Sequence, residues 1–228
     1  MGDNILKLIK PADIITIVNA LLGFASVINA LRGEVDSALV LVLMAVIADG
    51  ADGAVARYSG YGILGANLDS LADVVSFGLA PAVLAFYFLN RNMEYFAWVF
   101  SGLFLVCGTL RLARFNAAGK KDGFDGIPIT SGGFAVALFL QIRDSVPYFD
   151  SIFAILLVIL SLLMISTIAY PKLKNPAVLT PMTLLLFFDV VVFFLGYTEV
   201  VKIAALLLLI LIFGYILSPI GRRFYGKL

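Results

Sequence analysis

The amino-acid sequence predicts an all-α fold, that of a polytopic membrane protein with about eight transmembrane helices. Hydrophobic residues make up 62% of the 228 positions and charged residues only 14%, whereas about a quarter of a soluble domain is charged. Apolar stretches of about 20 residues, long enough to cross a bilayer, follow one another along almost the whole chain. Because the connections are too short to build a second core, we expect a single membrane domain over residues 1–228.

Polar and turn-forming segments set the boundaries of these helices. The predicted helices cover residues 12–32, 36–58, 65–90, 93–117, 129–143, 149–170, 177–196 and 199–220. They are separated, in chain order, by residues 33–35, 59–64, 91–92, 118–128, 144–148, 171–176 and 197–198. Gly, Pro and clustered charges in these segments are typical of turns. The fifth helix is the shortest.

Lysine and arginine are distributed unequally between the two ends of these helices. An even number of helices places both chain termini on the same side of the membrane. That side carries twelve basic residues: Lys7, Lys10, Arg57, Arg111, Arg114, Lys120, Lys121, Lys172, Lys174, Arg222, Arg223 and Lys227. The other side carries four: Arg32, Arg91, Arg143 and Lys202. Since cytoplasmic segments are enriched in Lys and Arg, we expect both termini to face the cytoplasm from a cell membrane.

Two residue types with versatile chemistry are absent or scarce. The chain contains no His, which excludes histidine metal ligands and histidine general bases. Its one cysteine, Cys107, has no partner for an intrachain disulfide and lies in an apolar run. The carboxylates are therefore the candidate metal-binding and catalytic groups.

Four aspartates lie inside the second and third apolar stretches, where an ionisable residue costs at least about 2.5 kcal/mol. Asp49 and Asp52 are three residues apart, and Asp69 and Asp73 are four apart. Each pair therefore shares one helix face. A short turn joins the two helices, which makes them antiparallel neighbours and brings both pairs towards the cytoplasmic surface.

The four carboxylates predict a metal site. Carboxylates that converge in a low-dielectric space cannot all stay ionised without cations. Oxygen ligands select Mg²⁺, Mn²⁺ or Ca²⁺, and four acids suffice for two ions of the kind used in phosphoryl transfer. Small residues beside the acids, Gly53 and Ala56, leave room for a close approach, and Arg57 can reach a phosphate. The alternatives are a polar packing contact and the ion path of a cation transporter.

The spacing of these residues resembles the signature of the CDP-alcohol phosphotransferase family. The matching positions are Asp49, Asp52, Gly53, Ala56, Arg57, Gly65, Asp69 and Asp73, with seven residues between Arg57 and Gly65. Within that family the chain is most similar to the membrane-embedded phosphatidylserine synthases. This likeness rests on LDSLADVVSFGLAP (68–81), RLARFN (111–116), GIP (126–128) and YPKLK (170–174), with TIVNALLGF (16–24) near the start. It extends from about residue 12 to 174.

The resemblance implies a six-helix core with additional helices, and a homodimer. It implies transfer of a phosphatidyl group from CDP-diacylglycerol, or a CDP-archaeol-type ether lipid, to L-serine, with CMP released. Two Mg²⁺ or Mn²⁺ ions, with Ca²⁺ as another occupant, would be bound by Asp49, Asp52, Asp69 and Asp73. Asp73 would also be the general base. The nucleotide and lipid phosphate would contact Asn19, Asp49, Gly53, Ala56 and Arg57.

The acceptor pocket is less defined by the sequence. Arg111 and Arg114 share a helix face, so either can bind a phosphate or the serine carboxylate. Asn116 follows on the same helix, and Ser76 lies near the stripe of the third-helix acids. The other interpretation of the basic residues is that they fix topology and contact anionic headgroups. Asp189, alone among Phe and Val, predicts an interhelical or dimer contact.

Two other functions stay open at this point. The same fold and chemistry with another acceptor would use glycerol phosphate, inositol phosphate or an amino alcohol. A cation transporter would use the aspartates as its ion path, although the chain shows no internal repeat. Membrane lipids are the expected surroundings, and no nucleic-acid partner is expected.

Overall fold

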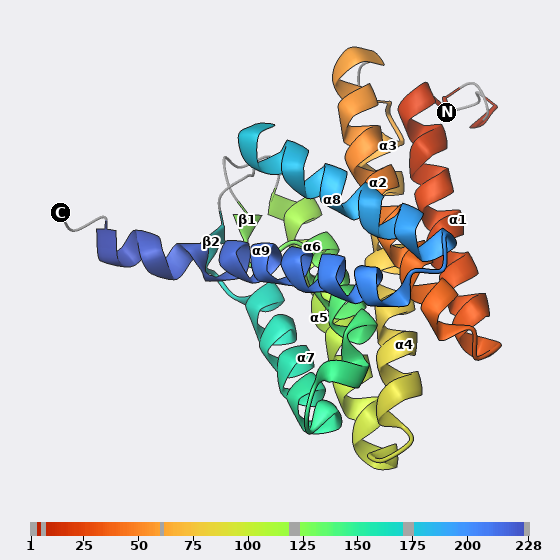
Figure 1. Ribbon diagram of the computed structural model, residues 1–228. Coiled ribbons are helices and arrows are strands. Elements are labelled where there is room, and N and C mark those ends of the chain that lie inside the picture. Colours follow the sequence, from red (N-terminus) through yellow and green to blue (C-terminus); the bar gives the residue numbers. More distant parts are fainter. Residues whose placement is uncertain (1–3, 6–7, 60–61, 119–123, 171–175, 226–228) are drawn as a thin grey trace.

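The computed structural model describes residues 4–5, 8–59, 62–118, 124–170 and 176–225. Within these ranges the chain is helical apart from two short strands (Figure 1). The elements are α1 (Pro11–Leu31), α2 (Val35–Ser59), α3 (Gly65–Asp73), the π-helical segment η2 (Val74–Leu79), α4 (Ala80–Leu89), α5 (Glu94–Ala118), β1 (Phe124–Asp125), α6 (Ile129–Gln141), the 3₁₀ turn η3 (Arg143–Ser145), α7 (Phe149–Ile165), β2 (Ala169–Tyr170), α8 (Pro176–Phe194) and α9 (Thr198–Tyr225).

The predicted helices are confirmed except for the end of the sixth, and α3, η2 and α4 form one continuous helix, Gly65–Leu89. Five helices are long and apolar enough to cross a membrane: Pro11–Leu31, Val35–Tyr58, Gly65–Leu89, Glu94–Ala117 and Thr198–Pro219. The apolar helices Ile129–Gln141, Phe149–Ile165 and Leu179–Phe194 are shorter. In the described residues the chain is therefore an all-α, multi-pass bundle, with α8 and α9 packed together across one face (Figure 1).

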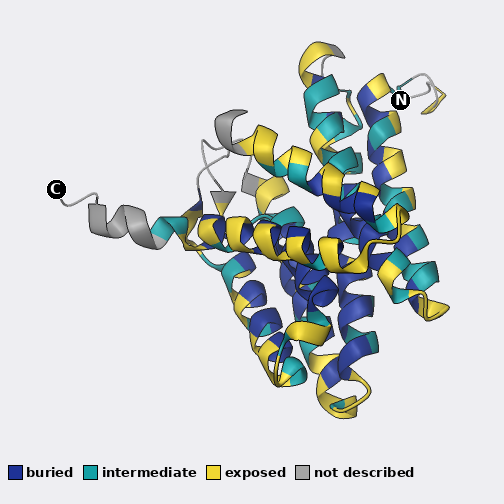
Figure 2. Cartoon of the chain, in the orientation of Figure 1, coloured by how far each residue is buried: buried dark blue, intermediate teal, exposed yellow. Residues whose placement is uncertain are grey.

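The bundle is apolar both inside and outside. Buried side chains gather where α2, α4, α5 and α6 meet, and include Leu39, Phe104 and Leu138 (Figure 2). The outward face of α9 is exposed yet apolar; Ile210 keeps 59% of its surface. Similar exposure is seen at Leu21 on α1, Trp98 on α5 and Phe187 on α8. Exposed apolar surface on this scale is typical of contact with lipid chains.

The sixth predicted helix is shorter than expected, since it ends at Ile165 instead of residue 170. The guanidinium of Arg114 donates to the carbonyl oxygens of Ile165 (3.0 Å), Met164 (3.2 Å) and Asp125. The Gly126 amide donates to Ile168 at 2.8 Å, and β1 pairs with β2 in antiparallel register. The Arg114 contacts satisfy the last carbonyls of α7 in place of a further helical turn, and the other two contacts hold the segment that follows α7.

Gly126→Ala is expected to lower stability by about 1–3 kcal/mol. Gly126 has φ +79°, and a Cβ there would lie 2.8 Å from the carbonyl oxygen of Leu163 and even closer to that of Met164. The matched control is Gly102→Ala, where an added Cβ meets nothing within 4 Å among the described residues. Thermal unfolding in detergent should show a lower midpoint for Gly126→Ala only; equal midpoints would contradict the strain.

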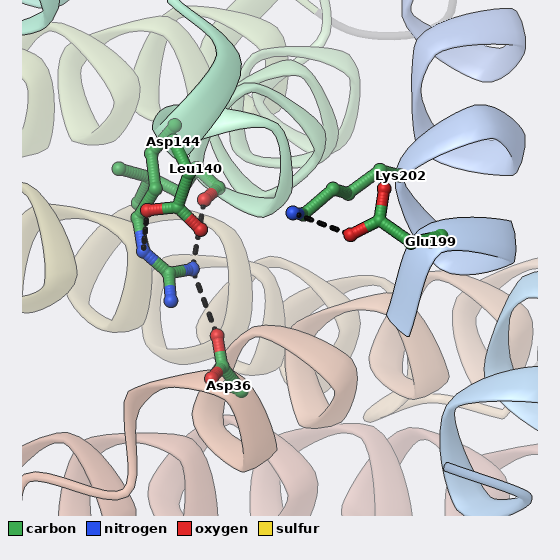
Figure 3. A network of polar contacts seen from close by, with 6 residues as sticks. Asp36, Leu140, Asp144, Glu199 and Lys202 are labelled. Carbon is green, nitrogen blue, oxygen red and sulfur yellow. Dashed lines mark hydrogen bonds and ion pairs between the residues drawn. The ribbon is translucent and has the colours of Figure 1, made fainter. Parts of the chain in front are cut away.

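The end of the bundle remote from the four aspartates is held by ion pairs (Figure 3). Arg143 on η3 pairs with Asp36 at the start of α2 (2.8 Å) and contacts Asp144 (3.8 Å). On α9, Lys202 pairs with Glu199 at 3.0 Å. The Arg143–Asp36 pair fixes the start of α2 against the end of α6 and leaves the opposite end of both helices for the site.

Candidate metal centre and active site

Three of the four aspartates meet between α2 and α3. Asp49, Asp69 and Asp73 each offer a carboxylate oxygen, and these oxygens all lie within 4.8 Å of one another. Mg²⁺ and Ca²⁺ bind oxygen at about 2.0–2.6 Å, so one ion between the three carboxylates can reach all of them. Asp73 is only 7% exposed. The hard-oxygen donor set and its spacing therefore fit a divalent cation.

Asp52 lies one turn along α2 from Asp49, outside that group of three. Its carboxylate accepts a hydrogen bond from the hydroxyl of Thr16 on α1 at 2.8 Å, and the side chain is 7% exposed. The charge of Asp52 still acts on Asp49, Asp69 and Asp73. All four predicted ligands are thus in one electrostatic cluster, with Asp52 at its edge.

Two threonines that the sequence analysis missed support the cluster. Thr16 orients Asp52, and the hydroxyl of Thr130, at the start of α6, hydrogen-bonds the Asp49 carboxylate. A signal for Thr16 was available, because it precedes Asn19 by three residues and both are polar on one face of an apolar helix. Thr130 comes from a distant part of the chain, and only the fold brings it to α2.

The residues predicted to receive the nucleotide lie on α1 and on the last turns of α2. Asn19 is fully buried on α1, and neither its side-chain oxygen nor its side-chain nitrogen has a hydrogen-bond partner within the described chain. Burying an unpaired amide is costly, so these atoms are available to a ligand. A Cβ at Gly53 would meet no atom within 4 Å in the part of the chain described. Ala56 is buried and Arg57 is exposed at the outer turn of α2.

Arg111 brings a positive charge to the aspartates. It lies on α5, only 6% exposed, with its guanidinium carbon 5.4 Å from the ring centre of Phe115. Its charge acts on Asp73 and is felt by Tyr215 of α9. A buried cation whose charge acts on Asp73 offsets part of the repulsion among the carboxylates.

The other residues predicted for the acceptor pocket make contacts within the protein. Arg114 binds the carbonyl groups at the end of α7, as described above. The Asn116 side chain donates to the Ser70 hydroxyl at 3.0 Å, next to Asp69 in sequence. The hydroxyl of Ser76 donates to the backbone oxygen of Asn19 at 2.8 Å, and Ser76 is fully buried. An acceptor role for these three residues stays a prediction.

Asp189 forms an interhelical contact. Its carboxylate accepts a hydrogen bond from the amide of Gln141, on α6, at 3.2 Å, and it is fully buried on α8. The pair joins α8 to the end of α6 that is remote from the metal cluster. The interhelical part of the prediction for Asp189 is confirmed.

Thr16→Val is expected to weaken Mn²⁺ binding about 10–100-fold, as loss of a partner behind a metal ligand commonly does. Val keeps the shape of Thr but removes the hydroxyl that orients Asp52. The control is Thr109→Val on α5, whose hydroxyl donates to the backbone oxygen of Leu105 in its own helix. Electron paramagnetic resonance of free Mn²⁺ measures both affinities. Wild-type affinity in Thr16→Val would contradict the orienting contact.

Comparison with known proteins agrees with the geometry. An archaetidylserine synthase of Methanothermobacter thermautotrophicus is 36% identical over 178 residues, covering 75% of this chain and 74% of that protein. A CDP-diacylglycerol–serine O-phosphatidyltransferase of Methanocaldococcus jannaschii is 39% identical over 173 residues, covering 75% and 79%. A protein of that same name from Bacillus subtilis is 32% identical over 165 residues, covering 72% and 90%. The sequence profile of the CDP-alcohol phosphatidyltransferases matches residues 10–171, close to the predicted extent. The chain belongs to the CDP-alcohol phosphatidyltransferase family.

Proposed function

We propose that this protein transfers the phosphatidyl group of a CDP-linked diacyl or ether lipid to the hydroxyl of L-serine and releases CMP. The observation that carries the proposal is the meeting of Asp49, Asp69 and Asp73 within 4.8 Å, in a family of phosphatidyltransferases. The choice of serine is supported by the names of the related proteins. Two archaeal relatives and one bacterial relative are all named for serine as the acceptor.

Two Mg²⁺ or Mn²⁺ ions fit the four aspartates, with Ca²⁺ as another occupant. Asp49, Asp69 and Asp73 would hold one ion, and Asp52 would complete the ligands of the second. Such ions, when bound, neutralise a pyrophosphate and stabilise the charge that develops in phosphoryl transfer. The sites need the carboxylates ionised and oriented, and Thr16 and Thr130 provide that orientation.

Asp73 is the general base of the proposed reaction. It is the deepest of the acids along α3, it is buried, and the charge of Arg111 acts on it. Its carboxylate takes the proton from the serine hydroxyl as the hydroxyl oxygen attacks the phosphorus that bears the lipid. The bond from that phosphorus to the oxygen of CMP breaks, and CMP leaves with the bond electrons. A base placed within hydrogen-bond reach contributes about 10²–10⁴-fold to such a step.

The nucleotide is proposed to lie along the inner face of α1 and α2. The unpaired amide of Asn19, the open space at Gly53 and the small side chain of Ala56 suit a cytidine diphosphate, with Arg57 at the mouth for a phosphate. The serine carboxylate is proposed to bind Arg111, with Arg114 and Asn116 as further acceptor-side residues. The positive charge of Arg111 acts on the proposed base, Asp73.

The hydrocarbon chains of the donor would remain in the bilayer. An apolar groove of about 550 Å³ runs between α7 and α9, lined by residues such as Leu156, Ile159 and Phe213. Its lining includes Tyr170, whose hydroxyl donates to the backbone of Ile216. A lipid substrate explains why the acids lie in a membrane bundle, which a water-soluble nucleotide would not require.

The cellular setting is proposed on the same basis. The chain would form one domain over residues 1–228, as a homodimer in the cell membrane. The excess of Lys and Arg supports a cytoplasmic position for both termini and the active site.

CMP release by the purified protein in detergent tests the function. Release that needs both L-serine and Mg²⁺ or Mn²⁺, with CDP-diacylglycerol or CDP-archaeol as donor, is the expected result. Metal-dependent release with glycerol phosphate, inositol phosphate or an amino alcohol in place of serine would keep the chemistry and replace the acceptor. No release with any acceptor would overturn the proposal.

The structure does not favour the cation transporter. An ion path would have to connect the aspartates with the polar end at Asp36, along α2. The α2 residues between them that are buried are apolar: Ala38, Leu39, Val40, Val42, Leu43 and Ala45. At the polar end Asp36 is already paired with Arg143. Uptake of ⁴⁵Ca²⁺ or ⁵⁴Mn²⁺ into proteoliposomes should therefore equal that of empty liposomes.

A further inference from the structure

The helix that carries Asp69 and Asp73 changes its geometry immediately after Asp73. Residues Val74–Leu79 form the π-helical segment η2, and the Ala80 amide donates to the carbonyl oxygen of Val75, five residues earlier. Such turns are rare, occur often at functional sites, and need support from their surroundings. The segment η2 is supported on two sides, by α1 and by α6, beside the metal cluster.

On one side η2 is held by α1. The hydroxyl of Ser76 donates to the backbone oxygen of Asn19 at 2.8 Å. One turn further along α1, a Cβ added to Gly23 would lie 2.6 Å from the Cα atom of Ser76. The two backbones therefore touch, and no larger residue fits at position 23 without moving η2.

On the other side η2 is held by α6. A Cβ added to Gly133 would lie 2.8 Å from the carbonyl oxygen of Phe77 and 2.9 Å from its Cα atom. Ser76 and Phe77 are both fully buried. The π-helical turn is therefore clamped between the backbones of two helices through a pair of glycines.

The same two helices also bind the acids of α2. Thr16, two turns before Gly23 on α1, donates to Asp52, and Thr130, three residues before Gly133 on α6, hydrogen-bonds Asp49. Each of α1 and α6 thus contacts one acid of α2 and also the π-helical segment that follows Asp73. A shift of η2 against either helix would move Asp73 relative to Asp49.

We propose that Gly23, Ser76 and Gly133 are positioning residues that clamp η2 and thereby set the depth and rotation at which Asp69 and Asp73 meet Asp49. Ser76 then acts through the backbone of α1, and its hydroxyl is not a contact to the acceptor alcohol. This inference rests on the proposed metal site. The irregular turn that follows Asp73 then serves to position the metal-binding aspartates.

The clamp is tested by Mn²⁺ binding to the detergent-purified, metal-free protein, followed by electron paramagnetic resonance. Gly133→Ala and Gly23→Ala are expected to weaken binding about 10–100-fold, as displaced support of a metal ligand does. Gly102→Ala and Gly214→Ala are the matched controls, because a Cβ there meets nothing within 4 Å in the described chain. Both controls should bind as the wild type does.

Ser76→Ala keeps the test decisive if either alanine variant fails to fold, since it removes only one hydroxyl. A positioning role predicts weaker Mn²⁺ binding and a lower kcat, with an unchanged KM for serine and a thermal midpoint near that of the wild type. A higher KM for serine with unchanged Mn²⁺ affinity would overturn the clamp and make Ser76 an acceptor contact. Wild-type Mn²⁺ affinity in all three variants would also overturn it. Absence of Mn²⁺ binding in the wild type would instead overturn the metal site itself.

Discussion

Asp73→Asn is expected to lower kcat by about 10²–10⁴-fold, the contribution of a well-placed general base. Asn has nearly the shape of Asp but cannot take a proton from the attacking hydroxyl. Asp73 is buried, and the charge of Arg111 acts on it, so no mobile group from the surface readily replaces it. The CDP-lipid should still bind, because Asp49, Asp52 and Asp69 keep their carboxylates.

Steady-state CMP release and CDP-lipid binding, measured on the same preparation, separate the possible roles of Asp73. Loss of turnover with retained lipid and Mn²⁺ binding would assign Asp73 to the base alone and leave the metal to the other aspartates. Loss of turnover together with Mn²⁺ affinity would assign Asp73 to metal ligation first. Activity equal to that of the wild type would refute both roles. Asp150→Asn is the control, since Asp150 bonds Asn92 at the remote end of the bundle.

The helices and the acid cluster could be predicted because they depend on local patterns. Apolar stretches long enough to cross a membrane predict the helices. Spacings of three and four residues predict that each pair of acids shares one helix face. The structure brings Asp49, Asp69 and Asp73 together as the spacing predicts. The end of α7 was predicted wrongly because it depends on Arg114 and Gly126, which lie far from it in sequence.

The support of the cluster could not be predicted for the same reason. Thr130 and Gly133 reach the site only because α6 packs against both α2 and η2. Ser76 lies close to the stripe of the α3 acids in an ideal helix, which suggested an acceptor contact. In the π-helical turn its hydroxyl donates to the backbone oxygen of Asn19. Helical spacing rules assume regular geometry, so they do not predict the partner of a side chain where the helix itself is irregular.

Removal of divalent cations is expected to abolish CMP release, and addition of Mg²⁺ or Mn²⁺ should restore it. Asp49→Asn or Asp69→Asn should weaken Mn²⁺ binding by at least about 100-fold, since loss of a mere supporting contact costs 10–100-fold. Each exchange removes one charged ligand from a group of three within 4.8 Å. Asp144→Asn, an exposed acid at the remote end, is the control. Full activity in excess chelator would contradict the metal site.

The number of Mn²⁺ ions bound by the wild type and by Asp52→Asn distinguishes a one-ion site from a two-ion site. Asp52 stands outside the group of three and is held by Thr16, so it is either a ligand of a second ion or a neighbouring charge. Two Mn²⁺ per chain in the wild type and one in Asp52→Asn would establish it as a ligand of the second ion. One Mn²⁺ per chain in both proteins would contradict the two-ion mechanism, and Asp52 would then act only through its charge on the other three aspartates.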